Sequence, residues 1–145
     1  MIAHCDSDWA SDPNHRRSQT GFFLSLANGI VTWNSSSQRS VALSSTEAEY
    51  MALCHCTRQV VWVRSLLAEI AHAIGTVPIC RDNQGAIFNI QNSIVEKRSK
   101  HIDVSYHFVK EHRLNKEVEY YYNPGTENPA DMLIKNLARV KFQYH

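Results

Sequence analysis

The chain has 145 residues, 43% hydrophobic and 20% charged, with a formal net charge of +1. This length suits one globular domain, here taken as residues 1–145, with a core of its own. No run of about 18 apolar residues occurs, so the sequence predicts no membrane span. The near-neutral charge gives no general attraction to nucleic acid.

Five short runs with apolar or alternating character predict strands. They cover residues 2–6, 20–27, 30–33, 77–80 and 117–123. The Asn28-Gly29 pair between the second and third runs is a hairpin signal, so these two strands should be antiparallel. The fourth run follows a long helical segment, and the right-handed crossover rule predicts that it pairs parallel with the first.

Helical spacing predicts helices over 45–72, 84–92 and 103–115, and a last helix that starts at Asn128-Pro129. Ser44 and Glu47, three residues apart, form a capping box at the start of the longest helix. Strands that alternate with helices in this order predict an α/β fold, with a mixed sheet flanked by helices.

Four acids fall near the ends of predicted elements. Asp6 closes the first strand and Asp82 follows the fourth, so parallel pairing would place both at one edge of the sheet. Glu49 heads the apolar stripe of the long helix, where it is either solvated or directed into a cation site. Asp131 lies in the first turn of the last helix, where the helix dipole favours its ionised form. Asp8 competes with Asp6, which we prefer because it directly ends the strand.

Taken singly, each of these acids has an ordinary explanation as a turn or cap residue, and only their joint placement indicates a site. Four carboxylates around one point are tolerable only if they are hydrogen-bonded or neutralised by a divalent cation. Ligands that are all oxygen favour Mg²⁺ or Mn²⁺. Two such ions, roughly 4 Å apart, suit in-line displacement at phosphorus.

Six segments of the chain form a family pattern that covers about residues 5–137. They are Cys5 to Ala10, Ser18 to Gly21, Val41 to Leu53, Asp82 to Gln84, Lys100 to Val109 and Asn128 to Lys135. In this order they resemble the ribonuclease H domain at the end of copia-like retrotransposon Pol polyproteins. The run Ala-Leu-Ser-Ser-Thr-Glu-Ala-Glu-Tyr is highly specific.

The resemblance implies a ribonuclease H-like fold, with a five-stranded mixed sheet and helices on both faces. It implies that Asp6, Glu49, Asp82 and Asp131 bind two Mg²⁺ (or Mn²⁺) ions and are the catalytic residues. The implied reaction is hydrolysis of the RNA strand of an RNA–DNA hybrid during reverse transcription, beside a reverse transcriptase domain of the same polyprotein. The implied location is the cytoplasm, in a virus-like particle, with the nucleus as the alternative.

Six residues are expected to contact nucleic acid: Ser45, Thr46, Asn83, Gln84, Lys100 and His101. Hydroxyl and N–H groups at a helix start can bind phosphate. A cap on the following helix is an equally good explanation of His101. The tryptophans at positions 9, 33 and 62 are expected in the core.

Arg81 stands where the family has a cysteine, and it either forms a salt bridge with Asp82 or points to the opposite face of the strand. Two other functions remain open. One is a catalytically inactive or domesticated module of the same fold, which binds nucleic acid or serves a structural role. The other is an integrase or resolvase core, against which the Ser-Ser-Thr-Glu-Ala-Glu-Tyr run argues.

Overall fold

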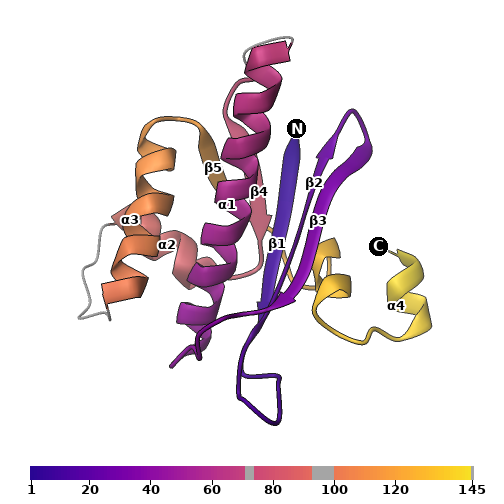
Figure 1. Cartoon of the computed structure of the whole chain (residues 1–145). Coiled ribbons are helices and arrows are strands. Elements are labelled where there is room, and N and C mark those ends of the chain that lie inside the picture. Colours follow the sequence, from indigo (N-terminus) through magenta and orange to yellow (C-terminus); the bar gives the residue numbers. More distant parts are fainter. Residues whose placement is uncertain (71–73, 93–99, 145) are drawn as a thin grey trace.

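A five-stranded mixed sheet runs through the computed structural model, which describes residues 1–70, 74–92 and 100–144 (Figure 1). The strands are β1 (Ile2–Asp8), β2 (Gln19–Leu26), β3 (Gly29–Ser37), β4 (Val77–Arg81) and β5 (Val118–Tyr122). Their order in the sheet is β3-β2-β1-β4-β5. The β1–β2 and β2–β3 pairs are antiparallel, and β1–β4 and β4–β5 are parallel. The sheet predicted from the sequence is therefore confirmed.

The hairpin between β2 and β3 differs from its prediction by one residue. Ala27 and Asn28 form the two-residue loop, with φ angles of 50° and 65°, while Gly29 already belongs to β3. A tight hairpin turn of this kind needs positive φ at both loop residues, and Asn tolerates that region well. The strand also continues to Ser37, beyond the predicted end at Trp33, because it stays paired with β2 as far as Gln19.

The described helices are α1 (Ser45–Ile70), α2 (Gln84–Asn92), α3 (Lys100–Leu114), the 3₁₀ helix η1 (Pro129–Leu133) and α4 (Arg139–Tyr144). The last two residues predicted for the longest helix, 71 and 72, lie outside the described part of the chain. Asn128 caps η1 as predicted, with its side chain accepting a hydrogen bond from the N–H of Ala130. None of the described helices has the length and apolar content that a bilayer crossing requires.

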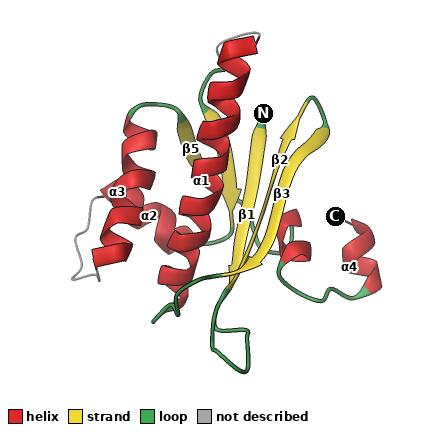
Figure 2. Ribbon diagram, in the orientation of Figure 1, coloured by secondary structure: helices red, strands yellow, loops and turns green. Residues whose placement is uncertain are grey.

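Helices lie on both faces of the sheet (Figure 2). Two neighbouring residues of β2, Thr20 and Gly21, show which helix covers which face. The Thr20 hydroxyl accepts a hydrogen bond from Gln38, whose amide nitrogen also donates to the Ala48 carbonyl of α1. The next residue, Gly21, faces η1, since a Cβ built on it would lie 2.6 Å from Ile134. Because successive strand residues point to opposite faces, α1 and η1 lie on opposite sides of the sheet.

The core lies between α1 and the central strands. The apolar stripe of α1 is buried from Leu53 through Val63, and it packs with Ala3 of β1 and Ile79 of β4 in one cluster. The apolar residues at this helical spacing continue to Ile70, which is 69% exposed. The stripe therefore covers the sheet only along the first part of the helix.

The expectation that the tryptophans lie in the core was wrong. The exposed fractions are 49% for Trp9, 68% for Trp33 and 59% for Trp62. Trp33 stands on the edge strand β3, and Trp62 lies off the buried stripe of α1, so neither reaches the core. Trp9 is held at the surface by a 3.1 Å hydrogen bond from its ring N–H to the Ala42 carbonyl.

Candidate metal centre

Asp6 and Asp82 come from neighbouring parallel strands. His4 of β1 is in register with Cys80 of β4, so the residues two further along, Asp6 and Asp82, follow equivalent positions. Both therefore lie at the same edge of the sheet, as the sequence predicted. One detail of that prediction was wrong, because β1 does not end at Asp6 but continues to Asp8. The extra residues pair with β2, which reaches further along β1 than β4 does.

Glu49 reaches this edge from the second turn of α1. The helix begins as predicted, with the N–H of Glu47 donating to the Ser44 hydroxyl at 3.1 Å. The Glu47 carboxylate accepts a 2.8 Å hydrogen bond from the N–H of Leu43. This start directs Glu49 inward, and the residue is only 7% exposed. Of the two readings left open for Glu49, the structure excludes a solvated carboxylate at the helix mouth.

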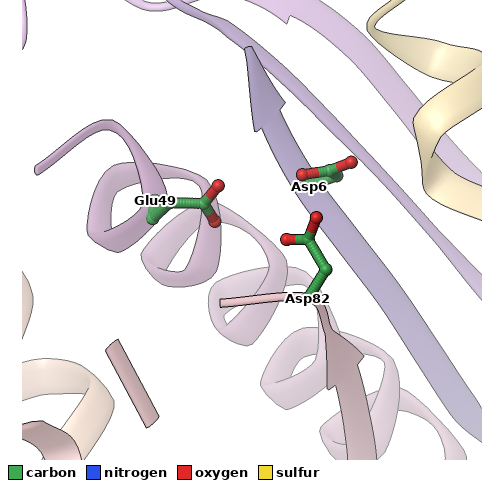
Figure 3. A group of neighbouring side chains, drawn as sticks. All are labelled: Asp6, Glu49 and Asp82. Atoms are coloured by element: carbon green, nitrogen blue, oxygen red, sulfur yellow. The ribbon is translucent and has the colours of Figure 1, made fainter. Parts of the chain in front are cut away.

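The three carboxylates converge in Figure 3. One oxygen each from Asp6, Glu49 and Asp82 lies within 4.8 Å of the other two. Asp6 is 2% exposed, and Asp82 is half-buried. An open pocket of about 400 Å³, lined in part by Glu49 and Asp82, connects the group to solvent. Asp8, the competitor of Asp6, is not a member of this group within the described residues.

The ionised form of Asp6 is disfavoured in the metal-free group. Its Oδ1 accepts a 2.8 Å hydrogen bond from the N–H of Ser7, while its buried Oδ2 has no hydrogen-bond partner among the described residues. Burial, followed by the charges of Asp82 and Glu49, raises the pKa of Asp6 to about 8. A divalent cation would relieve both causes, since it replaces lost solvation and offsets the repulsion. The residues present therefore fit a metal ion.

Arg81 pairs with Glu49 rather than with Asp82. Its Nη2 donates to Oε2 of Glu49 at 2.5 Å, and the arginine side chain is fully buried. Strand alternation explains this direction, because Arg81 points to the face that α1 covers, as one of the two predicted alternatives held. Burial raises the pKa of Glu49, although the Arg81 guanidinium beside it acts in the opposite direction.

Asp131 does not join the group of three. It is 2% exposed in η1, and each of its oxygens accepts a hydrogen bond from a lysine. Lys135 Nζ lies 2.6 Å from Oδ1, and Lys141 of α4 contacts Oδ2. Burial alone would raise the pKa of Asp131, but the hydrogen bonds from the two lysines hold it below its ordinary value.

The contacts of these two lysines with Asp131 were not predicted from the sequence. Lys135 carried a usable signal, since it stands four residues after Asp131, a spacing at which helical side chains meet. Lys141 carried none, because α4 was not predicted.

Two relatives of the chain are much longer proteins. It is 38% identical over 144 residues to the retrovirus-related Pol polyprotein from transposon TNT 1-94 of Nicotiana tabacum. It is 33% identical over 144 residues to that from transposon RE2 of Arabidopsis thaliana. These alignments cover 99% of this chain but 11% and 10% of the relatives. No family model matches the chain.

Two solved structures with the same fold are ribonucleases H. LC11-RNase H1, isolated from compost, superposes with a TM-score of 0.66 at 16% identity, over 92% of this chain and 91% of that one. The N-terminal RNase H domain of rv2228c from Mycobacterium tuberculosis gives a TM-score of 0.66 at 13% identity, over 99% and 97% of the two chains. The homologues of this chain include transposon Pol polyproteins, and its fold is that of ribonuclease H.

On this ribonuclease H fold, the residues expected to contact nucleic acid lie in two described places. Ser45 is exposed and Thr46 half-buried in the first turn of α1. Asn83 and Gln84 line the open pocket together with Glu49 and Asp82. Asn83 also caps α2, since its Oδ1 accepts a 2.9 Å hydrogen bond from the N–H of Ala86.

The remaining two expected contacts cannot be placed in the same way. Lys100 and His101 begin the backbone of α3, but their side chains lie outside the part of the chain that the structure describes.

Proposed function

We propose that this ribonuclease H-like domain is a metal-dependent endonuclease that cuts the RNA strand of RNA–DNA hybrids. The observation that carries the proposal is the convergence of Asp6, Glu49 and Asp82, with oxygens within 4.8 Å of one another and one buried oxygen of Asp6 unpartnered among the described residues. A structure neighbour, LC11-RNase H1, has been solved in complex with an RNA/DNA hybrid, with a TM-score of 0.64 to this chain at 13% identity.

The position of each residue would determine its role in binding the metal ion or the phosphate. Asp6 and Asp82, held by neighbouring strands, would bind the ion, with Glu49 completing the group from α1. Bound there, Mg²⁺ or Mn²⁺ would lower the pKa of a water molecule and stabilise negative charge on the phosphate. The exposed N-terminus of α1, with Ser45 and Thr46, would hold a neighbouring phosphate through hydroxyl and N–H groups.

We further propose that the domain acts beside a reverse transcriptase domain of the same polyprotein. The relatives are Pol polyproteins of which the chain spans about a tenth. The prototype foamy virus protease-reverse transcriptase also matches the fold, with a TM-score of 0.61 at 12% identity, over 92% of this chain and 20% of that one.

A second candidate function is a module that binds nucleic acid without cleaving it. The observation that favours it is the placement of basic side chains on two of the acids: Arg81 on Glu49, and Lys135 and Lys141 on Asp131. Such pairing neutralises carboxylates in the absence of metal, and it competes with a metal for the same oxygens.

A cleavage assay separates the two candidates. A labelled RNA–DNA hybrid is incubated with the domain and Mg²⁺ or Mn²⁺, with EDTA as the blank. The endonuclease proposal expects metal-dependent products, and loss of cleavage to the EDTA level in Asp6→Asn and Asp82→Asn. Glu69→Gln, at the exposed far end of α1, is the matched control and should cleave normally. Hybrid binding without any metal-dependent product would instead establish the binding module.

A further inference from the structure

We propose that Arg81 takes the place of one divalent ion at Glu49, so that the carboxylate group of Asp6, Glu49 and Asp82 binds a single divalent ion. This inference rests on the proposed function, and it concerns how the same site is neutralised. It differs from the two-ion site that the family resemblance implies.

The geometry places a permanent cation inside the group. Arg81 is the last residue of β4 and immediately precedes Asp82, while its side chain turns to the α1 face and reaches Glu49. The 2.5 Å contact between Nη2 and Oε2 occupies one of the two oxygens of Glu49. A guanidinium stays charged at any pH that the protein encounters, so this charge cannot be removed to admit a metal ion.

The charge balance then favours one ion over two. With all three carboxylates ionised, Asp6, Glu49 and Asp82 together with Arg81 carry two net negative charges, which one divalent ion neutralises. A second ion would make the group net positive. Lys135 adds positive charge nearby, where it influences the pKa of both Asp6 and Asp131. The repulsion between cations at such short range opposes a second ion strongly.

A purely structural role explains Arg81 less well. A buried ion pair that stabilises a fold normally has its other polar atoms hydrogen-bonded, because each unpaired one keeps its desolvation cost. Nε and Nη1 of Arg81 are buried, and neither has a hydrogen-bond partner in the described parts of the chain. The contact with Glu49 is thus the one interaction of the guanidinium that the described hydrogen bonds provide. This arrangement supplies positive charge to the carboxylate group, while two buried N–H groups of Arg81 are left without hydrogen bonds among the described residues.

Counting bound Mn²⁺ tests the proposal without relying on cleavage. Free Mn²⁺ gives an electron paramagnetic resonance signal that bound Mn²⁺ loses, so a titration of the purified domain reports the number of ions bound. We expect one ion for the wild type and two for Arg81→Met, which keeps the length of the side chain but removes its charge. Arg81→Lys should bind one ion, and so should Arg58→Met, which removes an exposed arginine further along α1.

The outcomes separate this proposal from the proposed function. Two ions in the wild type, or one ion in a folded Arg81→Met variant, would overturn the role of Arg81 and leave the metal site standing. Near-UV circular dichroism establishes folding, and if Arg81→Met does not fold, the wild-type count decides. An Asp6→Asn variant that binds as many ions as the wild type would show that the carboxylate group is not the metal site. That result would overturn the proposed function as well.

Discussion

Gly125 lies directly against the carboxylate of Asp82. A Cβ built on Gly125 would lie 2.8 Å from Oδ2 of Asp82, closer than van der Waals contact permits. The turn that follows β5 therefore leaves the Asp82 carboxylate in its observed position only because residue 125 is glycine. This contact ties the orientation of a metal ligand to a residue that carries no functional group.

Substitution of Gly125 by alanine should consequently weaken metal binding. The added methyl group displaces the Asp82 carboxylate from its position near Asp6, and disturbance of a ligand's support typically lowers metal affinity about 10-fold to 100-fold. Isothermal titration with Mn²⁺ measures the effect. Gly75→Ala is the control, because a Cβ there meets nothing within 4 Å. Equal Mn²⁺ affinity in folded Gly125→Ala and in the wild type would contradict the prediction.

Asp6 should make the stability of the metal-free protein depend on pH. Its pKa is raised from 3.8 to about 8, so the folded chain keeps a proton that the unfolded chain has already lost. The free energy of unfolding therefore falls as the pH rises from the lower value towards the higher one, by up to about 1.4 kcal/mol per pH unit. Below this window Asp6 is protonated in both the folded and the unfolded state, so it does not make the free energy of unfolding depend on pH.

The range from about pH 7 to about pH 8 lies inside this window, and comparison with Asp6→Asn separates the contribution of Asp6 from that of other groups. Burial lowers the pKa of His4 and of His55, so both imidazoles are neutral there in the folded state. Urea unfolding in EDTA should show the wild type losing about 1 kcal/mol across this unit, and Asp6→Asn losing much less. Parallel pH profiles for the two proteins would show that Asp6 does not hold the proton.

Removal of Lys141 should raise the pKa of Asp131. Lys141 and Lys135 hydrogen-bond to different oxygens of this carboxylate, and they hold its pKa down against the effect of burial. Lys141→Met leaves Oδ2 without this donor, so the pKa should move upwards, towards or above its ordinary value. Carbon-13 NMR of the side-chain carboxyl measures it. Lys116→Met serves as the control, and a pKa of Asp131 that is the same in both variants would refute the contribution of Lys141.

Asn128 should contribute to stability well beyond its role as a cap. It is fully buried, its Oδ1 accepts from the N–H of Ala130, and its Nδ2 donates to the Cys5 carbonyl at 3.1 Å. Asn128→Ala removes both bonds and should lower the free energy of unfolding by about 1–3 kcal/mol. Urea denaturation measures the loss. Asn115→Ala, at an exposed position, should change stability little, and equal stabilities for the two variants would contradict the prediction.

The parallel pairing of β1 with β4 could be predicted from the sequence because it depends on local patterns. A hairpin, a long helix and a returning apolar strand leave few topologies, and one of them brings Asp6 and Asp82 to the same edge. The burial of Glu49 could not be decided in this way. Its position in the stripe was visible, but its environment depends on how α1 seats on the sheet.

The contacts of two basic residues, Arg81 with Glu49 and Lys141 with Asp131, could not be predicted from sequence patterns for a related reason. Strand alternation allowed Arg81 to point away from Asp82, yet only the packing of α1 over β4 shows that Glu49 meets it. Lys141 lies in a six-residue helix too short to leave a periodic signal, and its contact with Asp131 spans ten residues. The prediction that the tryptophans are buried was based on residue type alone. Residue type does not decide whether a position is covered, for example on the edge strand β3.

The parallel pairing of β1 with β4 has a mechanical consequence for the site. Backbone hydrogen bonds between β1 and β4 fix the main chain next to Asp6 and Asp82, although the Asp82 carboxylate itself still depends on the space that Gly125 leaves. Glu49 lies in α1 and Asp131 lies in η1, on opposite faces of the sheet, and each can shift with its helix. We therefore expect Glu49 to adjust the geometry of the carboxylate group, while the backbone of the two strands acts as its rigid frame.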